Sequence, residues 1–582
     1  MTTSLRLLLE DFLGLMREEG ELDAFLPLLL AAMGHEIVSR AQKGPRQYGV
    51  DVATVGRDAD GRIKFFMWLV KCGDIGRSEW DSGPNSVRQS INDVGDTYID
   101  SHIDPRLAKY PRKLVVLTNG DFLSSMNLTI ASFLKKWSRA HDVEVQQVNG
   151  SALAAMVERS LLDEYILPSG DRALLRRMLA NVGSPELCIS VGRELINSIL
   201  VRCKAPAKST RARRKNLLTG LRGIRTALSV LRIWAQKEDN LLAPYRLAEF
   251  AILTVWAHLH DEMLGGQPEA VGEYVELLWL MTAIGNSYHL RLEPFVTTQN
   301  AFAKILPDSL LVTDAVFTEL GRLGLQGCIW AYFASQGGGD VAYAMTAAYV
   351  NRVLALLQSH SCTASPAYDH HAVDIHVALL CIAIAGHLLE AKTWVEAMAF
   401  RLAYAVDHRK YWPLSASFED ALPLRHSDDE PDDELMAFTT LVPVLLLWSA
   451  VLGMQEVYEF LRSSVVAKLG TTTMNLWSPD IGFDAALADP IQLAQHGVGE
   501  ALLHVDPDPV AFIAEMSKPL SEVAAIDQAP WYRQGLAYLP LLSAVHWRLQ
   551  VPREMLARQT LAVVQTAPQQ AVDTGATRQP PV

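Results

Sequence analysis

Apolar residues follow two different spacings along this chain, and the change of spacing divides it into parts. At residues 21–33 they recur every three or four positions, which is typical of an amphipathic helix. Short apolar runs bounded by turn residues predict strands at 48–55, 63–71, 113–117 and 143–148. Further helical patterns cover 4–19, 85–102, 122–139 and 151–165. This alternation predicts an α/β domain over residues 1–168, with a mixed sheet flanked by helices.

After residue 168 strand patterns nearly vanish and helical spacing dominates. No fixed repeat period is evident, so we expect a large, irregular solenoid-like or packed helical region. We divide it into a helical connector with a basic linker (169–240), an all-α interaction or sensor domain (241–566) and a disordered tail (567–582). The predicted helices are 171–181, 185–203, 216–237, 243–264, 269–286, 308–323, 340–359, 372–390, 392–405, 434–452, 455–467, 509–518 and 531–548.

Two charged residues interrupt or end apolar, strand-like runs near the amino end. Asp51 directly follows a Gly-Val pair, and Lys71 follows the run from Phe65 to Val70. Burying such charges is costly unless something pairs with them. On adjacent strands the two residues could meet beside a divalent cation, with Asp51 holding the metal and Lys71 near the attacking water or the phosphate. A buried Asp–Lys ion pair without chemistry is the simpler alternative.

Four short motifs occur in order between residues 20 and 165. They are an acidic helix start at 22–25, a Gly-Val-Asp core at 49–51, the lysine that ends 63–71, and a strand that ends in Thr118-Asn119-Gly120. Their order and spacing resemble the PD-(D/E)xK restriction-endonuclease superfamily, most of all its Mrr-like branch. The resemblance implies a restriction-endonuclease-like α/β fold that hydrolyses nucleic-acid phosphodiesters with Mg²⁺ or Mn²⁺. It also implies that Asp51 and Lys71 are catalytic and that Asp51 binds the metal.

The chain departs from the family at one position. The resemblance implies Glu or Gln two residues before the lysine as a second metal ligand, and this chain has Leu69 there. We expect Asp23 or Asp74 to supplement the metal site, with Glu36 and Gln89 as further candidates. If none of them takes that role, the domain binds nucleic acid without cutting it.

Basic residues indicate where a nucleic acid would lie. In the predicted helix 85–102, Arg88 and Gln89 would approach a phosphodiester, unless they only form a solvated helix face. Between Glu194 and Glu238 there are eleven Lys and Arg and no acidic residue. Such a block is typical of proteins that contact a phosphate backbone, although a solubilising linker has a similar composition. Its densest part, in the predicted linker, contains Arg211, Arg213, Arg214 and Lys215.

Composition narrows the class of protein further. The net charge of −13 argues against a wholly basic nucleic-acid coat but leaves a local basic surface open. Six scattered cysteines without a C-x-x-C pair favour reduced thiols in the cytoplasm over a disulfide frame or zinc site. The longest uncharged apolar run, 438–454, contains Pro443 and is short for a bilayer span, so we expect no membrane segment.

Together these patterns favour a cytoplasmic, metal-dependent endonuclease that cuts DNA more readily than RNA. The helical region would dock a protein partner or form a homo-oligomer. By analogy with the family, the combination suits a prokaryotic defence or restriction effector. Two alternatives stay open: a catalytically inactive nucleic-acid-binding or assembly protein that retains the nuclease fold, and a helical scaffold for a partner enzyme.

Overall fold

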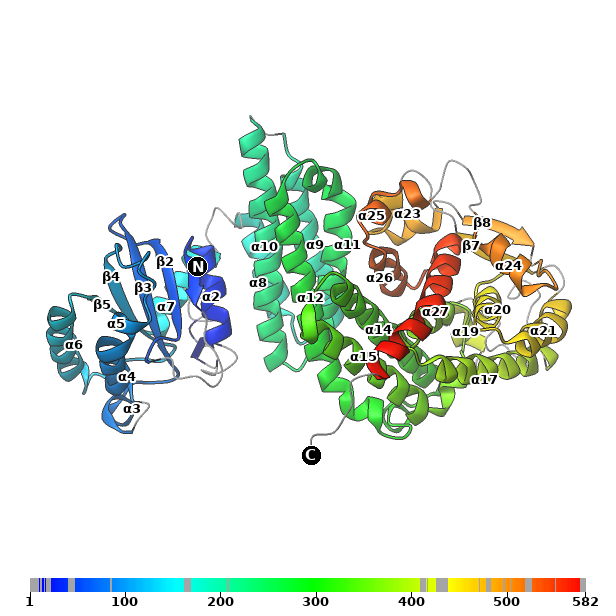
Figure 1. The fold of residues 1–582 in the computed structure, drawn as a ribbon, viewed down its shortest axis with the longest axis horizontal. Coiled ribbons are helices and arrows are strands. Elements are labelled where there is room, and N and C mark those ends of the chain that lie inside the picture. Colours follow the sequence, from blue (N-terminus) through cyan, green and yellow to red (C-terminus); the bar gives the residue numbers. More distant parts are fainter. Residues whose placement is uncertain are drawn as a thin grey trace. The chain divides into compact units, whose positions relative to one another are not determined.

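The computed structural model describes most of the chain, which forms two compact units, residues 1–234 and 235–582. The described residues are 10, 13–14, 16, 22–39, 48–83, 86–161, 169–206, 209–408, 415, 417–424, 438–469, 472–477, 483–495, 498–502, 504–518, 526–549 and 551–575, a few of them as backbone alone. Figure 1 shows the elements of both units.

The first unit combines a sheet with helices. Its elements are α2 (Asp23–Ala32), β1 (Glu36–Ser39), β2 (Val52–Arg57), β3 (Ile63–Lys71), α3 (Arg77–Asp81), α4 (Val87–Asp93), the π-helical turn η2 (Val94–Tyr98), α5 (Ile99–Ser101), β4 (Arg112–Thr118), α6 (Asn127–His141), β5 (Glu144–Val148), α7 (Gly150–Leu161), α8 (Ser169–Ala180), α9 (Pro185–Cys203) and α10 (Thr210–Lys237), whose last residues belong to the second unit.

The five strands form one mixed sheet in the order β1-β2-β3-β4-β5. β1, β2 and β3 are antiparallel neighbours, whereas β3, β4 and β5 run parallel. The parallel strands are joined through helices, as parallel pairing requires. The predicted mixed sheet flanked by helices is therefore confirmed, and β3 has the predicted bounds.

Helices cover both faces of this sheet, and α2 and α6 lie on opposite sides of it (Figure 1). On one face, Phe65, Met67 and Leu69 of β3 join an apolar cluster with Trp80 of α3 and Ile91 of α4. On the other face α2 and α7 pack together and against the strands. Because β3 is covered on both faces, its sequence is a continuous apolar run and does not alternate between apolar and polar residues.

The predicted strand 48–55 is wrong at its start. β2 begins at Val52, and Tyr48 and Gly49 form a turn with φ of +48° and +79°. A Cβ on Gly49 would lie 2.0 Å from the carbonyl oxygen of Ser90 and 3.0 Å from Val94, so only glycine lets this turn approach α4 and η2 so closely. The exposed strand β1 was not predicted.

The second unit is mainly helical. Its elements are α11 (Leu242–Leu264), α12 (Pro268–Thr297), α13 (Phe302–Ile305), α14 (Ser309–Ser335), α15 (Gly339–Ser359), η3 (Ser361–Ala364), α16 (His371–Ile384), α17 (Leu388–Asp407), α19 (Phe418–Leu424), β6 (Phe438–Thr439), α20 (Leu441–Val451), α21 (Gln455–Ser464), η5 (Val466–Lys468), β7 (Thr473–Trp477), α22 (Phe483–Ala486), α23 (Pro490–Gln495), β8 (Val498–Leu502), α24 (Pro509–Met516), η7 (Ile526–Gln528), α25 (Pro530–Arg533), α26 (Tyr538–Trp547) and α27 (Arg553–Gly575).

Helix α14 lies at the centre of this unit and packs against α12, α15, α16 and α26. Its close approach to α16 depends on glycine, because a Cβ on Gly324 would lie 2.8 Å from the backbone nitrogen of Ala378. Buried charges meet at the same interface: Arg548 donates hydrogen bonds to Asp374 of α16 and Thr318 of α14. The interior of the helical unit is therefore polar as well as apolar.

Three predictions for the region beyond residue 168 need correction. The predicted all-α domain contains a small sheet, in which β7 pairs with both β6 and β8. The last part of the predicted linker, residues 210–215, is helical, since α10 begins at Thr210. The predicted disordered tail is helical as far as Gly575, and residues 576–582 lie outside the described part. None of the described helices is both long and apolar enough to cross a bilayer.

The close approach of Gly49 to α4 can be tested against a second glycine with nearly the same backbone. Gly61 has φ of +81°, but among the described residues no atom beyond its chain neighbours lies within 4 Å of where a methyl group would be. We expect Gly61→Ala to cost about 1–2 kcal/mol through backbone strain. Gly49→Ala should cost more than about 3 kcal/mol, because the methyl also collides with a backbone oxygen. Native-state hydrogen exchange of the β2 and β3 amides measures both; equal losses would contradict the close-packing argument.

Candidate functional site

The carboxyl ends of the parallel strands bring several polar residues to one edge of the sheet. β3 ends at Lys71, β4 at Thr118 and β5 at Val148. Asp51 joins this edge because β2 runs antiparallel to β3, so that its first residues lie beside the last residues of β3. Ligands in sheets of this kind commonly bind outside the carboxyl ends of the strands.

Asp51 is held against the last residues of β3. Its N–H donates to the Trp68 carbonyl oxygen at 2.9 Å, and its Oδ2 accepts from the Val70 N–H at 2.7 Å. Asp51 is therefore fixed beside the residue that precedes Lys71, and both charged side chains are half-buried. The structure thus brings the two predicted catalytic residues to one place.

Leu69, at the position where the resemblance implies a second metal ligand, is an apolar core residue. Its side chain is 1% exposed and packs in the cluster that includes Trp80 and Ile91. A carboxylate at this position would be buried among apolar groups at high cost. The substitution therefore matches its surroundings, and a second metal ligand would have to come from another residue.

Asp74 belongs to a group of hydrogen-bonded residues at the same edge. Its Oδ1 accepts from the Asp121 N–H at 2.8 Å, and an Asp121 oxygen accepts from the Asn149 amide at 2.8 Å. The buried Asn119 amide accepts from Gly73 N–H at 2.7 Å. It also donates to the carbonyl oxygens of Leu13 and Met16, at 2.7 and 2.8 Å. From the sequence this Thr-Asn-Gly turn was interpreted as a motif of the resemblance, and the bonds that Asn119 makes to distant backbone groups were not predicted.

Of the other predicted metal ligands, Glu36 lies farther along the sheet from Asp51. Asp23 begins α2, and only its backbone is described. Glu36 pairs with Val55, four residues along β2 from Asp51, which is about 13 Å of strand. Within the described ranges, no three His, Cys, Asp or Glu residues form a group that could hold a metal ion.

The predicted nucleic-acid contacts near this edge are exposed on α4. Arg88 forms an ion pair with Asp81 at 3.2 Å, and its guanidinium lies 5.2 Å from the Phe133 ring centroid. Gln89 donates to Asp93 at 2.8 Å. Both interactions are at the surface, where they contribute little stability and can be exchanged for a phosphate.

The predicted basic linker forms the first turns of α10. Arg211, Arg214 and Lys215 are spaced to share one helix face with Arg222, which is eleven residues after Arg211. Arg213 lies away from this stripe. The side chains of Arg211, Arg213, Arg214 and Lys215 are exposed, and α10 contains no Asp or Glu.

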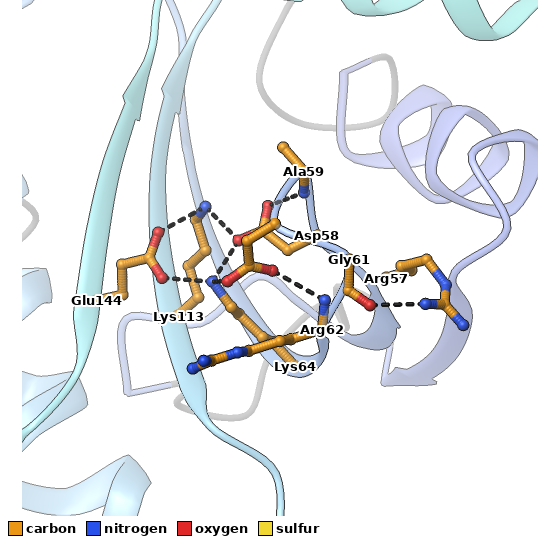
Figure 2. Close-up of polar contacts among 9 residues, drawn as sticks. Arg57, Asp58, Ala59, Gly61, Arg62, Lys64, Lys113 and Glu144 are labelled. Carbon is orange, nitrogen blue, oxygen red and sulfur yellow. Dashed lines mark hydrogen bonds and ion pairs between the residues drawn. The ribbon is translucent and has the colours of Figure 1, made fainter.

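A second charged group lies at the opposite end of β3, shown in Figure 2. Lys64 and Lys113 each have side chains only 6% exposed, and they share the carboxylates of Asp58 and Glu144. The four Nζ–oxygen distances are between 2.6 and 2.9 Å, and Asp60 adds a further contact to Lys64 at 2.9 Å. The network ties the β2–β3 turn to β4 and β5.

The network shifts the pKa values of Asp58 and Lys64 in opposite directions. Burial alone would raise the pKa of Asp58, but hydrogen bonds from Lys113 and Lys64 outweigh it and hold this pKa well below its usual range. Burial alone would lower the pKa of Lys64, but its bonds to Asp58, Glu144 and Asp60 raise it. These groups stay charged at neutral pH and pair with one another, so we assign the network a structural role. Sequence reasoning missed it, although Lys64 and Lys113 adjoin apolar strands just as Lys71 does.

Comparison with known proteins adds no family assignment, because the chain matches no family model, no curated protein and no solved structure. The case for a function therefore depends on the site itself.

The pH dependence of stability should reveal the Asp58 network. The folded-state pKa of Asp58 is depressed, so its contribution is present above the unfolded value of about 4 and is lost as pH falls below it. At pH 7, Asp58→Asn should destabilise the sheet by about 3 kcal/mol, since it leaves two buried ammonium groups with fewer partners.

Asp60→Asn is the matched control, because the Asp60 side chain is 44% exposed and its contact with Lys64 is screened by solvent. This variant should lose much less stability than Asp58→Asn. Denaturant unfolding between pH 3 and 7 measures both variants. A wild-type protein and an Asp58→Asn variant with the same acid dependence would show that Asp58 is not the linked group.

Proposed function

We propose that this protein is a metal-dependent endonuclease that hydrolyses phosphodiester bonds at the edge of the sheet formed by Asp51 and Lys71. The observation that carries the proposal is the convergence of these two residues. Asp51 is fixed by two hydrogen bonds to β3, next to the end of the strand that carries Lys71. An acid and an amine at neighbouring strand ends suit metal-assisted attack on a phosphate.

The donor set fits Mg²⁺ better than a metal that needs a protein cage. Mg²⁺ commonly uses one or two carboxylates and takes its other ligands from water and substrate phosphates. Asp51 would hold it, with Asp23 or Asp74 as a second donor, and Mn²⁺ would bind similarly. When bound, the metal would polarise the phosphate and lower the pKa of a bound water.

The protein's own groups have separate tasks in this proposal. Asp51 orients the metal because its carboxylate is tied to the Val70 N–H. Lys71 would supply a positive charge near the phosphate and stabilise the negative charge that develops during attack. The hydrogen bonds of Asn119 and Asp121 hold the segments after β3 and β4 together, which preserves the positions of Asp51 and Lys71.

The basic stripe of α10 and the exposed Arg88 and Gln89 support nucleic acid as the substrate, with DNA favoured over RNA. We further propose a cytoplasmic defence or restriction role, in which the helical unit docks a protein partner or a second copy. This last step depends on the resemblance to the restriction-endonuclease superfamily alone.

One observation favours a second function, that of a nucleic-acid-binding or assembly protein without catalysis. Leu69 is buried in an apolar cluster where the family's second ligand would be. A site with a single firmly placed carboxylate can keep the fold and the binding surface after cleavage is lost.

Cleavage assays with Mg²⁺ or Mn²⁺ on plasmid and single-stranded DNA separate these functions. Asp51→Asn and Lys71→Met should each reduce the cleavage rate about 10²–10³-fold, because each removes charge stabilisation from the transition state. Asp100→Asn, on the exposed surface of α5, is the control and should cut normally.

The two functions differ in what the assay would show. Binding that weakens with salt but no cutting under either metal would favour the binding protein. Cutting that survives both Asp51→Asn and Lys71→Met would place the catalytic centre elsewhere.

A further inference from the structure

A strained turn lies directly before Asp51. Tyr48 has φ of +48° in the left-handed region, which is uncommon for non-glycine residues and is an outlier for a bulky one. Asp, Asn and the like tolerate this conformation better than an aromatic residue does. Backbone strain of this kind costs about 1–3 kcal/mol and persists only where surrounding contacts impose it; it is common at ligand sites.

The strained turn presents its aromatic ring to a second ring. The Tyr48 centroid lies 4.8 Å from that of His102, and the His102 ring is stacked on Tyr98 at 5.6 Å with an interplanar angle of 17°. Tyr98 is buried, Tyr48 is half-buried and His102 is exposed. The three rings therefore lie in a row in the order Tyr98, His102 and Tyr48, with Tyr48 tilted by 51° to His102 and partly packed against the core cluster; we call this row the Tyr48 stack.

The helix beneath this stack is also irregular. Val94–Tyr98 is a π-helical turn inserted between α4 and α5, and such turns are frequent at functional sites. Val94 touches the Gly49 position, and Tyr98 ends the π-turn as the base of the stack. Two uncommon backbone features, one in the turn and one in the helix, thus meet at the same rings.

The Tyr48 stack is close to the proposed cleavage site. Asp51 is three positions after Tyr48, so their Cα atoms are at most about 11 Å apart. Lys71, at the end of β3, provides the positive charge of this edge, and Arg88 on α4 is paired with Asp81. An aromatic surface beside a cationic one is the combination with which proteins hold unpaired nucleotides.

We propose that the Tyr48 stack is a platform for an unpaired nucleobase, so that the strand reaching Asp51 is single-stranded or locally unpaired. This inference depends on the proposed function, since it names the form of the substrate at that site. Tyr48 and His102 are the two rings of the row that solvent reaches. An aromatic ring that solvent reaches can stack on any base, so binding would tolerate sequence. A base within a duplex has both faces covered by its neighbours and cannot use the platform.

The experiment measures binding without cleavage. The full-length protein is titrated, with EDTA present, into fluorescently labelled oligothymidylate of 20 nucleotides and into a mixed-sequence duplex of the same length, followed by anisotropy. We expect Tyr48→Ala and His102→Ala to weaken single-strand binding about 5- to 100-fold. Tyr48→Phe, which keeps the ring, should bind like the wild type.

Tyr110→Ala is the matched control. Tyr110 is also half-buried in the first unit, but it precedes β4 and lies near the opposite end of the sheet. It should leave binding unchanged. Because the Tyr48 stack carries no phosphate contact, Tyr48→Ala should lower the affinity at every salt concentration without changing the slope of affinity against salt. A merely misfolded variant would lose duplex binding and the salt slope as well.

The outcomes separate this inference from the proposed function. Single-strand affinity that is equal in Tyr48→Ala and wild type overturns the platform, even if the wild type cuts DNA through Asp51. Equal losses for duplex and single strand overturn it as well. Selective loss of single-strand binding supports it, and it stands even if no variant cuts under any metal.

Discussion

Burial of β3 is the constraint on which the sheet unit depends. This strand is the middle of five, is covered on both faces and carries a lysine near each end. Neither ammonium group can enter a protein interior alone. At one end, acids from the β2–β3 turn and β5 neutralise Lys64 together with Lys113. At the other, Lys71 emerges beside Asp51, and the polar groups there remain near the surface. The strand thus separates a charged network used for stability from one that is suited to chemistry.

At the edge that Asp51 joins, two neighbouring segments differ in their backbone conformation. At the carboxyl edge, strand ends are locked together by Asn119 and by glycines whose positions leave no room for a methyl group. The turn before Asp51 is instead strained at Tyr48, and it packs near the π-helical turn η2. Asp51 therefore lies between strand ends that are held by close contacts and a turn that is strained. This combination is compatible with a site that positions Asp51 and Lys71 and also binds a ligand.

Sequence patterns captured the sheet unit well where a segment's structure follows from its own residues. β3 is continuously apolar between clear turn signals, and its predicted bounds are those observed. The patterns failed where distant contacts decide. β1 is exposed, and its residues do not alternate between apolar and polar. The sequence of Tyr48–Gly49 is compatible with a strand, and only the structure reveals the positive φ values. The bonds from Asn119 to Leu13 and Met16 join segments about a hundred residues apart. Asp51 and Lys71 could be paired in advance because adjacent strands carry both; the surroundings of Leu69 could not.

The network at the start of β3 has a consequence for how the chain is made. Glu144 is the last of its members to be synthesised, some 80 residues after Lys64. Until β5 leaves the ribosome, the two lysines have Asp58 and Asp60 as their partners within the network, so a nascent sheet would be incompletely neutralised. Stable closure of the sheet should therefore wait for the fifth strand. That delay would leave the edge of β4 open during translation, a period in which a chaperone or another strand can pair with it.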